Sequence, residues 1–230
     1  MHDPEPVLIS IQVGTPRTIA SNAEGATDAS DRRWTTGIFK SPVEGPLFLG
    51  ATNLAGDGQA DPENHGGPDK AVCAYSADHY GDWRADPELA AMAPGAFGEN
   101  FTIRGLTETT VCVGDIWSVG DALIQVSQPR QPCWKLARKW GVKDLTARVV
   151  RTGRTGWYFR VLREGTVSAG ARLTLLDRQY PAWTIQAAND VMHGRPVDVD
   201  ASAALGTIPA LSRAWRGTLT SRARGEYLTR

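Results

Sequence analysis

The sequence contains few cysteines, and none has a disulfide or zinc-site spacing. Its three cysteines, Cys73, Cys112 and Cys133, are far apart and form no Cys-x-x-Cys pair. An odd number of isolated thiols argues against an oxidised framework, and zinc sites need ligands at closer, repeated spacings. We therefore expect reduced thiols. A chain of 230 residues, 41% of them hydrophobic, can bury a core without covalent staples.

An excess of one charge and a long apolar run are also missing. The 25 Lys and Arg residues balance 25 Asp and Glu residues, so nothing general favours a nucleic-acid backbone or an anionic membrane as partner. No apolar run approaches the roughly 18 residues of a membrane span. The first residues, Met-His-Asp-Pro-Glu-Pro, contain no apolar signal-peptide core. We expect a cytoplasmic protein with a small-molecule ligand and with neither a nucleic-acid polymer nor a membrane as partner.

Several common catalytic and cofactor motifs are absent. The sequence has no phosphate-binding loop, no dinucleotide fingerprint, no Gly-x-Ser-x-Gly elbow and no internal repeat. The loop at 57–70 contains His65 and several carboxylates, but it lacks the spacing that directs several ligands to one ion. We therefore expect no metal site that is built from protein side chains alone.

The apolar pattern predicts a mainly β fold. From Val7 to about Asp177, short apolar runs are broken often by Gly, Pro, Asn and Asp, which suits a barrel or sandwich better than βαβ units. We expect residues 7–13 and 173–176 to form the first and the closing strand. Residues 116–126 are expected to form a hairpin, because a two-residue Gly-Asp loop suits a type II′ turn. Helical segments are expected at about 77–84, 134–140 and 145–151.

The pattern changes near residue 180, which predicts a β-barrel domain over 1–180 and a three-helix domain over 181–230. Thr184 is the expected N-cap of the first helix, which ends at His193-Gly194. The second helix is expected to start after Asp200. The third is expected to begin at Pro209, with apolar residues at four-residue spacing, namely Leu211, Trp215 and Leu219.

The segment Gln128-Pro129-Arg130-Gln131-Pro132-Cys133-Trp134-Lys135 presents a thiol on a stiff, cationic loop. Two prolines restrict φ and bias the residues before them toward extended conformations. Arg130, Lys135 and the first amides of a helix near Trp134 would favour the thiolate of Cys133 over the thiol. A half-buried structural cysteine is the alternative interpretation, because free cysteines are usually buried.

Two further segments carry groups that suit an anionic ligand. Lys40 and Ser41 offer a charge and a hydroxyl that fit a phosphate, although Lys40 could equally be an ordinary surface lysine. Glu99 and Asn100 follow a glycine, and they fit either a site or a turn that hydrogen-bonds to itself.

His65 precedes two glycines, Gly66 and Gly67. Such a pair allows a positive φ or a close backbone approach, and it would hold His65 toward a pocket while Asp69 and Lys70 pair or cap. Taken alone, a histidine in this position is a turn or core residue about as often as a functional one.

In this order and spacing, the segments resemble the MOSC domains, the family named for the C-terminal domain of molybdenum-cofactor sulfurases. The resemblance covers nearly all of residues 1–180. The matching segments are Ile38-Phe39-Lys40-x-Pro42-Val43-x-Gly45-Pro46, Gly56-Asp57-x-Gln59-Ala60-Asp61, His65-Gly66-Gly67-x-Asp69-Lys70, Phe97-Gly98-Glu99-Asn100, Val113-Gly114-Asp115, Gln128-Pro129-Arg130-x-Pro132-Cys133-x-Lys135 and Gly153-x-x-Gly156-Trp157. Residues 181–230 resemble the three-α-helix domain of the bacterial YiiM-type branch, the hydroxylaminopurine-resistance proteins.

The resemblance implies a MOSC-type β-barrel that binds molybdenum cofactor, a pterin dithiolene with a phosphate. It also implies reduction of N-hydroxylated bases and related compounds to amines. Cys133 matches the family's cysteine ligand of molybdenum, which makes it the expected metal ligand and a catalytic residue, and a soft thiolate suits that metal. His65 is a second catalytic candidate, as a proton donor to the leaving hydroxyl. By charge and hydrogen-bonding type, the residues expected to bind the phosphate and pterin groups are Lys40, Ser41, Arg130, His65 and Lys135.

Two other functions stay open at this point. A Cys133 thiolate could carry a persulfide as a sulfur carrier, or the domain could bind or deliver the cofactor without turnover. Because no flavin or nicotinamide motif is present, we expect electrons from a separate flavoprotein. The three helices are expected to cap the barrel or to form a homodimer contact, and docking of the electron donor is the other interpretation.

Overall fold

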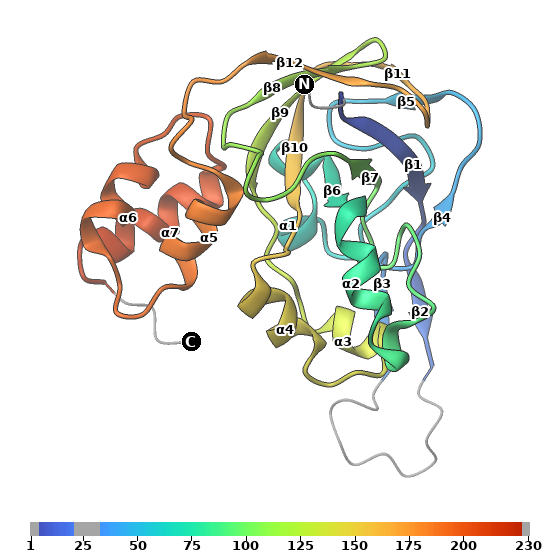
Figure 1. Cartoon of the computed structure of the whole chain (residues 1–230), viewed down its shortest axis with the longest axis horizontal. Helices are drawn as coiled ribbons and strands as arrows, with labels where there is room; N and C mark the ends of the chain where they lie inside the picture. The colour runs from blue at the N-terminus through green and yellow to red at the C-terminus, as the bar shows by residue number, and fades with distance from the viewer. Residues whose placement is uncertain (1–4, 21–32, 227–230) are drawn as a thin grey trace.

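The computed structural model describes residues 5–20 and 33–226 (Figure 1). Residues 1–4 and 21–32 of the predicted barrel domain and residues 227–230 of the predicted three-helix domain lie outside these ranges. The main element is an eight-stranded sheet in the order β12-β8-β9-β10-β6-β7-β1-β4. Its strands are β1 (Val7–Val13), β4 (Ser41–Pro42), β6 (Val72–Ser76), β7 (Phe101–Arg104), β8 (Ile116–Val119), β9 (Ala122–Pro129), β10 (Trp157–Arg163) and β12 (Leu173–Asp177). Two short pairs lie beside it, β2 (Arg17–Ile19) with β3 (Trp34–Thr36) and β5 (Leu47–Leu49) with β11 (Gly165–Val167).

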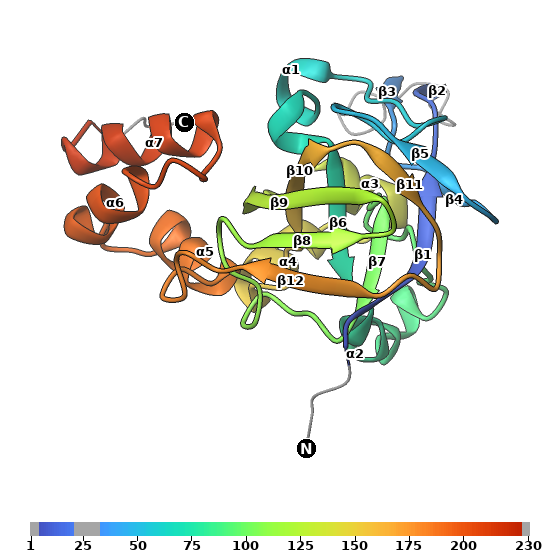
Figure 2. The same ribbon diagram turned by 90° about the horizontal axis from the view of Figure 1, so that it is seen from above.

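The large sheet curls until its two sides meet. Its strand pairs are antiparallel except for the parallel pair β6 and β7. The curl is closed beside β1, where Val7 forms a bridge with Arg172 and the Leu8 amide donates to the Ala171 carbonyl at 2.9 Å. Seen from above, the strands surround a common interior (Figure 2). The prediction of a mainly β, barrel-type fold is therefore confirmed.

The strands expected from the sequence are present as β1, β8, β9 and β12. Gly120, in the loop between β8 and β9, has a φ of +55°. Among the described residues only glycines have positive φ, so Asp121 does not. A type I′ turn needs positive φ at both loop residues, whereas type II′ needs it only at the first. The hairpin therefore has the turn that its Gly-Asp loop predicts.

Short helices connect the strands. The expected helical segments are found as η3 (Ala77–His79) with α2 (Tyr80–Arg84), α3 (Lys135–Trp140) and α4 (Leu145–Thr152). Three single turns were not predicted, and each begins with a proline, which suits the first helical position. They are α1 (Pro62–His65), η2 (Pro68–Lys70) and η4 (Pro87–Leu89).

Three helices follow the barrel, and two of them start at other residues than the pattern predicted. The first, α5 (Ile185–His193), has the expected cap, because the Thr184 hydroxyl accepts from the Ala187 amide at 3.0 Å. The second, α6 (Val199–Gly206), begins earlier than expected, since Asp198 accepts from the Ala201 amide at 2.8 Å.

The third helix, α7 (Arg213–Ala223), begins four residues later than the predicted Pro209. The Ser212 hydroxyl caps it by accepting from the Trp215 amide at 3.2 Å. Leu211 lies in the turn before this cap and is buried. Leu211, before the helix, and Trp215 and Leu219, within it, are all buried. The four-residue spacing therefore indicated burial and gave too early a start for the helix.

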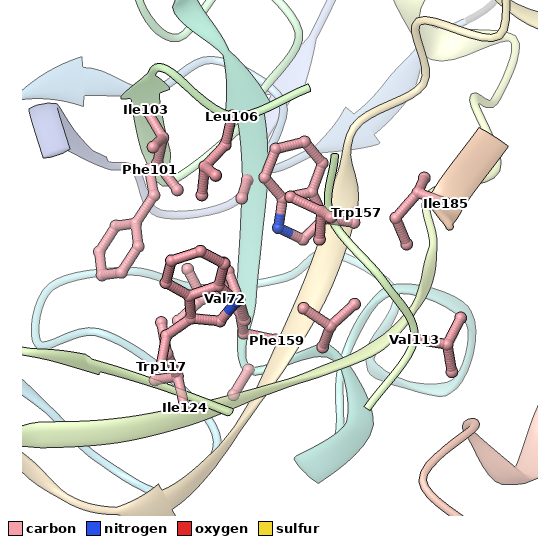
Figure 3. Packing of buried hydrophobic residues seen from close by; sticks show 14 of the residues in the cluster. Val72, Phe101, Ile103, Leu106, Val113, Trp117, Ile124, Trp157, Phe159 and Ile185 are labelled. Atoms are coloured by element: carbon pink, nitrogen blue, oxygen red, sulfur yellow. The ribbon is translucent and has the colours of Figure 1, made fainter. Parts of the chain in front are cut away.

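The apolar core is continuous from the barrel into the three helices. Figure 3 shows Ile185 of α5 close to Trp157 and Val113 of the barrel, and all three belong to one buried cluster with Trp215 and Leu219 of α7. A second cluster lies on the α2 and α3 side of the barrel and includes Tyr75, Phe97 and Trp83. Within 5–20 and 33–226, no helix is both long and apolar enough to cross a membrane.

Candidate functional site

A pocket of about 650 Å³, measured to its open mouth, lies beside the loop that follows β9. Segments far apart in the sequence line it, namely residues 36–40, 58–70, 97–100 and 130–135, with two side chains from the sheet. Five of the six predicted site residues meet there: Lys40, His65, Arg130, Cys133 and Lys135. The sixth, Ser41, is exposed in β4 and does not line the pocket.

Cys133 is half-buried at the wall of this pocket. Its carbonyl accepts from the Leu136 amide at 3.1 Å and from the Thr146 hydroxyl at 3.3 Å. These two bonds tie the proline-flanked loop to the beginnings of α3 and α4. The sulfur is therefore carried by a fastened loop and reaches the pocket without being sealed in the apolar core.

Arg130 supplies a cationic group that lacks one acceptor. The residue is buried, with 6% of its surface exposed, and its Nη2 donates to the Phe97 carbonyl at 2.7 Å. Its Nη1 is buried and has no hydrogen-bond partner in the described part of the chain. A buried guanidinium N–H without an acceptor costs free energy. An anionic ligand in the pocket would remove that cost.

Lys40 lines the pocket as half of a buried ion pair. Its ammonium group bonds to Asp57, and the two side chains are 6% and 0% exposed. Asp57 also accepts from the Gly14 amide and from Asn100 Nδ2, both at 2.9 Å. Lys40 is therefore not an ordinary surface lysine, and its charge is already partly compensated by the protein.

His65 enters the pocket from the end of α1. The Gly67 φ of +87° turns the chain after it, as the glycine pair predicted. Burial lowers the pKa of His65, and the nearby Lys135 ammonium lowers it further. The imidazole is consequently neutral near pH 7, and it can both donate and accept a hydrogen bond. A bound anion would favour protonation of His65, because opposite charges attract.

Glu99 is buried and does not line the pocket. Its fully buried carboxylate accepts from the amides of Gly95 and Phe97, at 2.7 Å and 3.1 Å, and from the hydroxyls of Tyr80 and Thr102. Of the two interpretations for this segment, the self-bonded turn holds for Glu99, whereas Asn100 lines the pocket. The turn fixes the Phe97 carbonyl that holds Arg130.

Among the pocket residues that the sequence did not single out are two on the large sheet. Cys73 of β6 and Tyr158 of β10 are directly paired across the sheet, and both line the pocket. Burial raises the pKa of Cys73 to about 11, so this thiol stays protonated. The available signal was strand alternation, because the residues beside them, Val72 with Ala74 and Trp157 with Phe159, are in the core.

The described residues contain no group of three or more His, Cys, Asp or Glu side chains that could hold a metal ion. A metal bound by Cys133 would therefore need most of its ligands from a bound cofactor or from solvent.

Comparison with known proteins groups this chain with one family. The MOSC domain matches residues 61–174, and the YiiM-like, 3-alpha helix domain matches residues 183–224. The uncharacterized protein YflK of Bacillus subtilis is 44% identical over 211 residues, which are 92% of this chain and 91% of YflK. The chain belongs to the MOSC family, in its YiiM-type branch. MOSC domains are associated with binding of molybdenum cofactor, and the cationic pocket of this MOSC protein lies mostly within the matched residues.

Two further similarities cover most of this MOSC protein. The crystal structure of YiiM from Geobacillus stearothermophilus has a TM-score of 0.77 at 39% sequence identity and covers 95% of this chain and 99% of that chain. A protein named "Reductase" from Gibberella moniliformis is 39% identical over 178 residues, which are 76% of this chain and 32% of that protein.

Proposed function

We propose that this MOSC protein is a molybdenum-cofactor-dependent reductase of N-hydroxylated bases and related compounds. The reaction is R-NHOH + 2 e⁻ + 2 H⁺ → R-NH₂ + H₂O. The observation that carries the proposal is the half-buried Cys133 on the wall of a cationic pocket whose Arg130 has a buried, unpartnered Nη1. The name of the Gibberella moniliformis relative supports a reductase activity in this type of protein.

The pocket residues fit the cofactor's chemistry. The described part of the chain brings no set of three or more likely metal donors together, and a pterin dithiolene supplies sulfur ligands of its own. Arg130 and Lys135 present cationic groups to a phosphate, and Lys40 adds the ammonium group paired with Asp57.

Each side chain then has a defined task. When bound, the molybdenum cofactor supplies the two-electron redox chemistry. Cys133 holds the metal through its sulfur, and Arg130 orients the anionic part of the cofactor through Nη1. His65, which lines the same pocket, would hydrogen-bond the hydroxylamino group and deliver a proton to the leaving hydroxyl once negative charge in the pocket favours its protonation. Electrons come from a separate flavoprotein.

The test replaces each of the two pocket cysteines in turn. Cys133→Ser is expected to lose most bound molybdenum and at least about a hundredfold in turnover of hydroxylaminopurine, since a neutral hydroxyl replaces the anionic thiolate that is proposed to hold the metal. Cys73→Ser is the matched control, because Cys73 lines the same pocket as a protonated thiol. Molybdenum is measured by elemental analysis and the pterin by fluorescence after oxidation. Loss of molybdenum from the Cys73 variant instead of the Cys133 variant would contradict the assignment.

The same purified protein separates the other two functions. Labile sulfur on Cys133 without molybdenum would indicate a sulfur carrier. Bound pterin without turnover of hydroxylaminopurine, in the presence of a supplied reductant, would indicate a binding or delivery module. Near-stoichiometric molybdenum together with turnover is the result that the proposed reductase requires.

A further inference from the structure

The segment 62–70 brings His65 and Lys70 into the pocket. Through Asp69 it is also hydrogen-bonded to the three-helix domain. Asp69 lies between the pocket residue Lys70 and Pro68 in η2, but it does not line the pocket. Its Oδ1 accepts from Arg160 Nε at 3.0 Å and from Arg160 Nη2 at 2.7 Å, which joins the loop to β10. Its Oδ2 accepts from the backbone amide of Arg213 at 3.0 Å.

The Arg213 amide belongs to the first residue of α7. Amides in the first turn of a helix have no partner within the helix, and negative charge is favoured at that end. Asp69 therefore supplies from the barrel both an acceptor and a charge for α7. Asp69 and Arg213 are 144 residues apart along the chain.

Two more hydrogen bonds run parallel to it. The fully buried Ser127 of β9 donates through its hydroxyl to the Asp69 carbonyl at 2.5 Å. The Ser127 carbonyl accepts from the Ser212 amide at 2.8 Å, and Ser212 is the N-cap of α7. The loop, the strand and the start of α7 thus form one hydrogen-bonded unit.

On the pocket side, the side chains of the same loop contact other residues of the loop. Lys70 Nζ donates to the Asn64 carbonyl at 2.5 Å, and the His65 imidazole faces Asp61 at 3.7 Å. None of these contacts connects His65 or Lys70 to the barrel wall. Their placement depends on the backbone, and that backbone is anchored at Asp69.

We propose that Asp69 is a positioning residue through which the three-helix domain sets His65 and Lys70 in the pocket. Docking of α7 and binding of an anion in the pocket are then coupled, and each favours the other. The three-helix domain accordingly takes part in the function of the pocket although none of its described residues, up to 226, lines the pocket.

The test deletes one N–H group. Arg213→Pro removes the amide hydrogen that Asp69 accepts, at a position where proline suits a helix. The preceding Ser212 has φ −56° and ψ 150°, a conformation that tolerates a following proline. Arg213→Ala is the matched control, because it removes the side chain and keeps the amide. Asp69→Asn, which removes the charge that both the Arg213 amide and the Arg160 guanidinium face, is the second variant.

Hydrogen exchange is the first measurement. The amides of His65, Gly66 and Lys70 are hydrogen-bonded within the loop and report on its order. Arg213→Pro and Asp69→Asn are expected to speed their exchange about tenfold, since a hydrogen bond to a charged group is lost. Arg213→Ala is expected to exchange like the wild type. Wild-type exchange rates in Arg213→Pro would overturn the proposal, whatever the asparagine variant shows, because Asp69→Asn also weakens the ion pair with Arg160.

The second measurement separates positioning from a general loss of structure. The imidazole resonance of His65 is expected to shift in Arg213→Pro, whereas those of His79 in the barrel and His193 in α5 are expected to stay in place. Equal shifts of all three would show a global effect and would overturn the positioning role.

The third measurement rests on the proposed function. Arg213→Pro is expected to retain less pterin than Arg213→Ala, by about fivefold or more. Pterin content equal in these two variants, with the wild type loaded, would overturn the coupling. A wild type without pterin would contradict the proposed function, while the exchange and resonance results would still decide the role of Asp69.

Discussion

Asp57 shows how a single buried residue changes the meaning of a predicted site lysine. The sequence presents Lys40 as a cation beside a hydroxyl, but in the fold its ammonium group is paired with a carboxylate 17 residues away. Ser41, the predicted hydroxyl partner, is exposed in an edge strand. A pattern of neighbouring residue types cannot reveal a pair that only tertiary contact creates, and it cannot show to which side of a strand a hydroxyl points.

The Lys40 and Asp57 pair leads to a stability prediction. Lys40→Met alone is expected to lower the free energy of unfolding by roughly 3 kcal/mol or more, because it leaves a buried carboxylate without its cation. Asp57→Asn alone is expected to be similarly costly, since it leaves a buried ammonium. The double variant, Lys40→Met with Asp57→Asn, is expected to be more stable than either single variant, as measured by urea unfolding.

Additive losses in the double variant would show that the two groups do not interact. The cycle also bears on cofactor content, because a Lys40 variant can lose cofactor either with its charge or with its fold. Cofactor content measured in the double variant, at restored stability, separates these two causes.

At the scale of elements, the turn at residues 95–99 decides the shape of the pocket. Gly98 lines the pocket with a φ of +75°, and a Cβ at this position would come within 2.7 Å of Ile38 Cγ1. The motif therefore needs glycine for two reasons, its left-handed backbone and the close approach of the segment before β4. The sequence indicated the glycine and left open what surrounds it.

Substitution of Gly98 tests both reasons. Gly98→Ala is expected to destabilise the protein by about 2–3 kcal/mol, from an unfavourable φ plus displacement of Ile38. Gly45→Ala is the matched control, because Gly45 has a φ of +80° and no atom within 4 Å of a new Cβ. The control is expected to cost only about 1–2 kcal/mol. Equal losses in thermal or urea unfolding would show that the contact with Ile38 is unimportant.

The helices illustrate how far local signals reach. Thr184 was recognised as a cap because a hydroxyl residue directly precedes an apolar helical pattern. Ser212 was overlooked because buried Leu211 continues the four-residue spacing of Trp215 and Leu219 on the far side of the cap. Apolar spacing reports burial, and burial continues past the end of a helix into the turn that packs beside it.

At the scale of the whole molecule, the barrel and the three helices share one apolar core. Trp215 of α7 is 2% exposed and belongs to the same cluster as Trp157 of the barrel. Residues that are distant in sequence therefore depend on one another for burial. The two regions are expected to unfold together, although their sequences differ in character.

A core substitution checks this cooperativity. Trp215→Ala is expected to lose about 3–5 kcal/mol, and hydrogen exchange is expected to accelerate in β9 and β10 as well as in α5 to α7. Trp134→Ala is the matched control, since Trp134 is 55% exposed and its loss should change the unfolding free energy little. Faster exchange confined to the three helices would contradict a shared core.

The sequence by itself determined the fold class, most strands and the segments that approach the pocket, because alternation, turn residues and caps are local properties of the chain. The tertiary structure alone decided which groups meet: the buried pair of Lys40 with Asp57, the unpartnered nitrogen of Arg130, and the contact between Asp69 and α7. Those depend on strand order and on the closure of the sheet; the contact between Asp69 and Arg213, for example, joins residues 144 positions apart. A local sequence pattern does not show which distant residues come into contact. The compensation of the Lys40 charge by Asp57 and the contact of Asp69 with α7 are therefore visible only in the folded molecule.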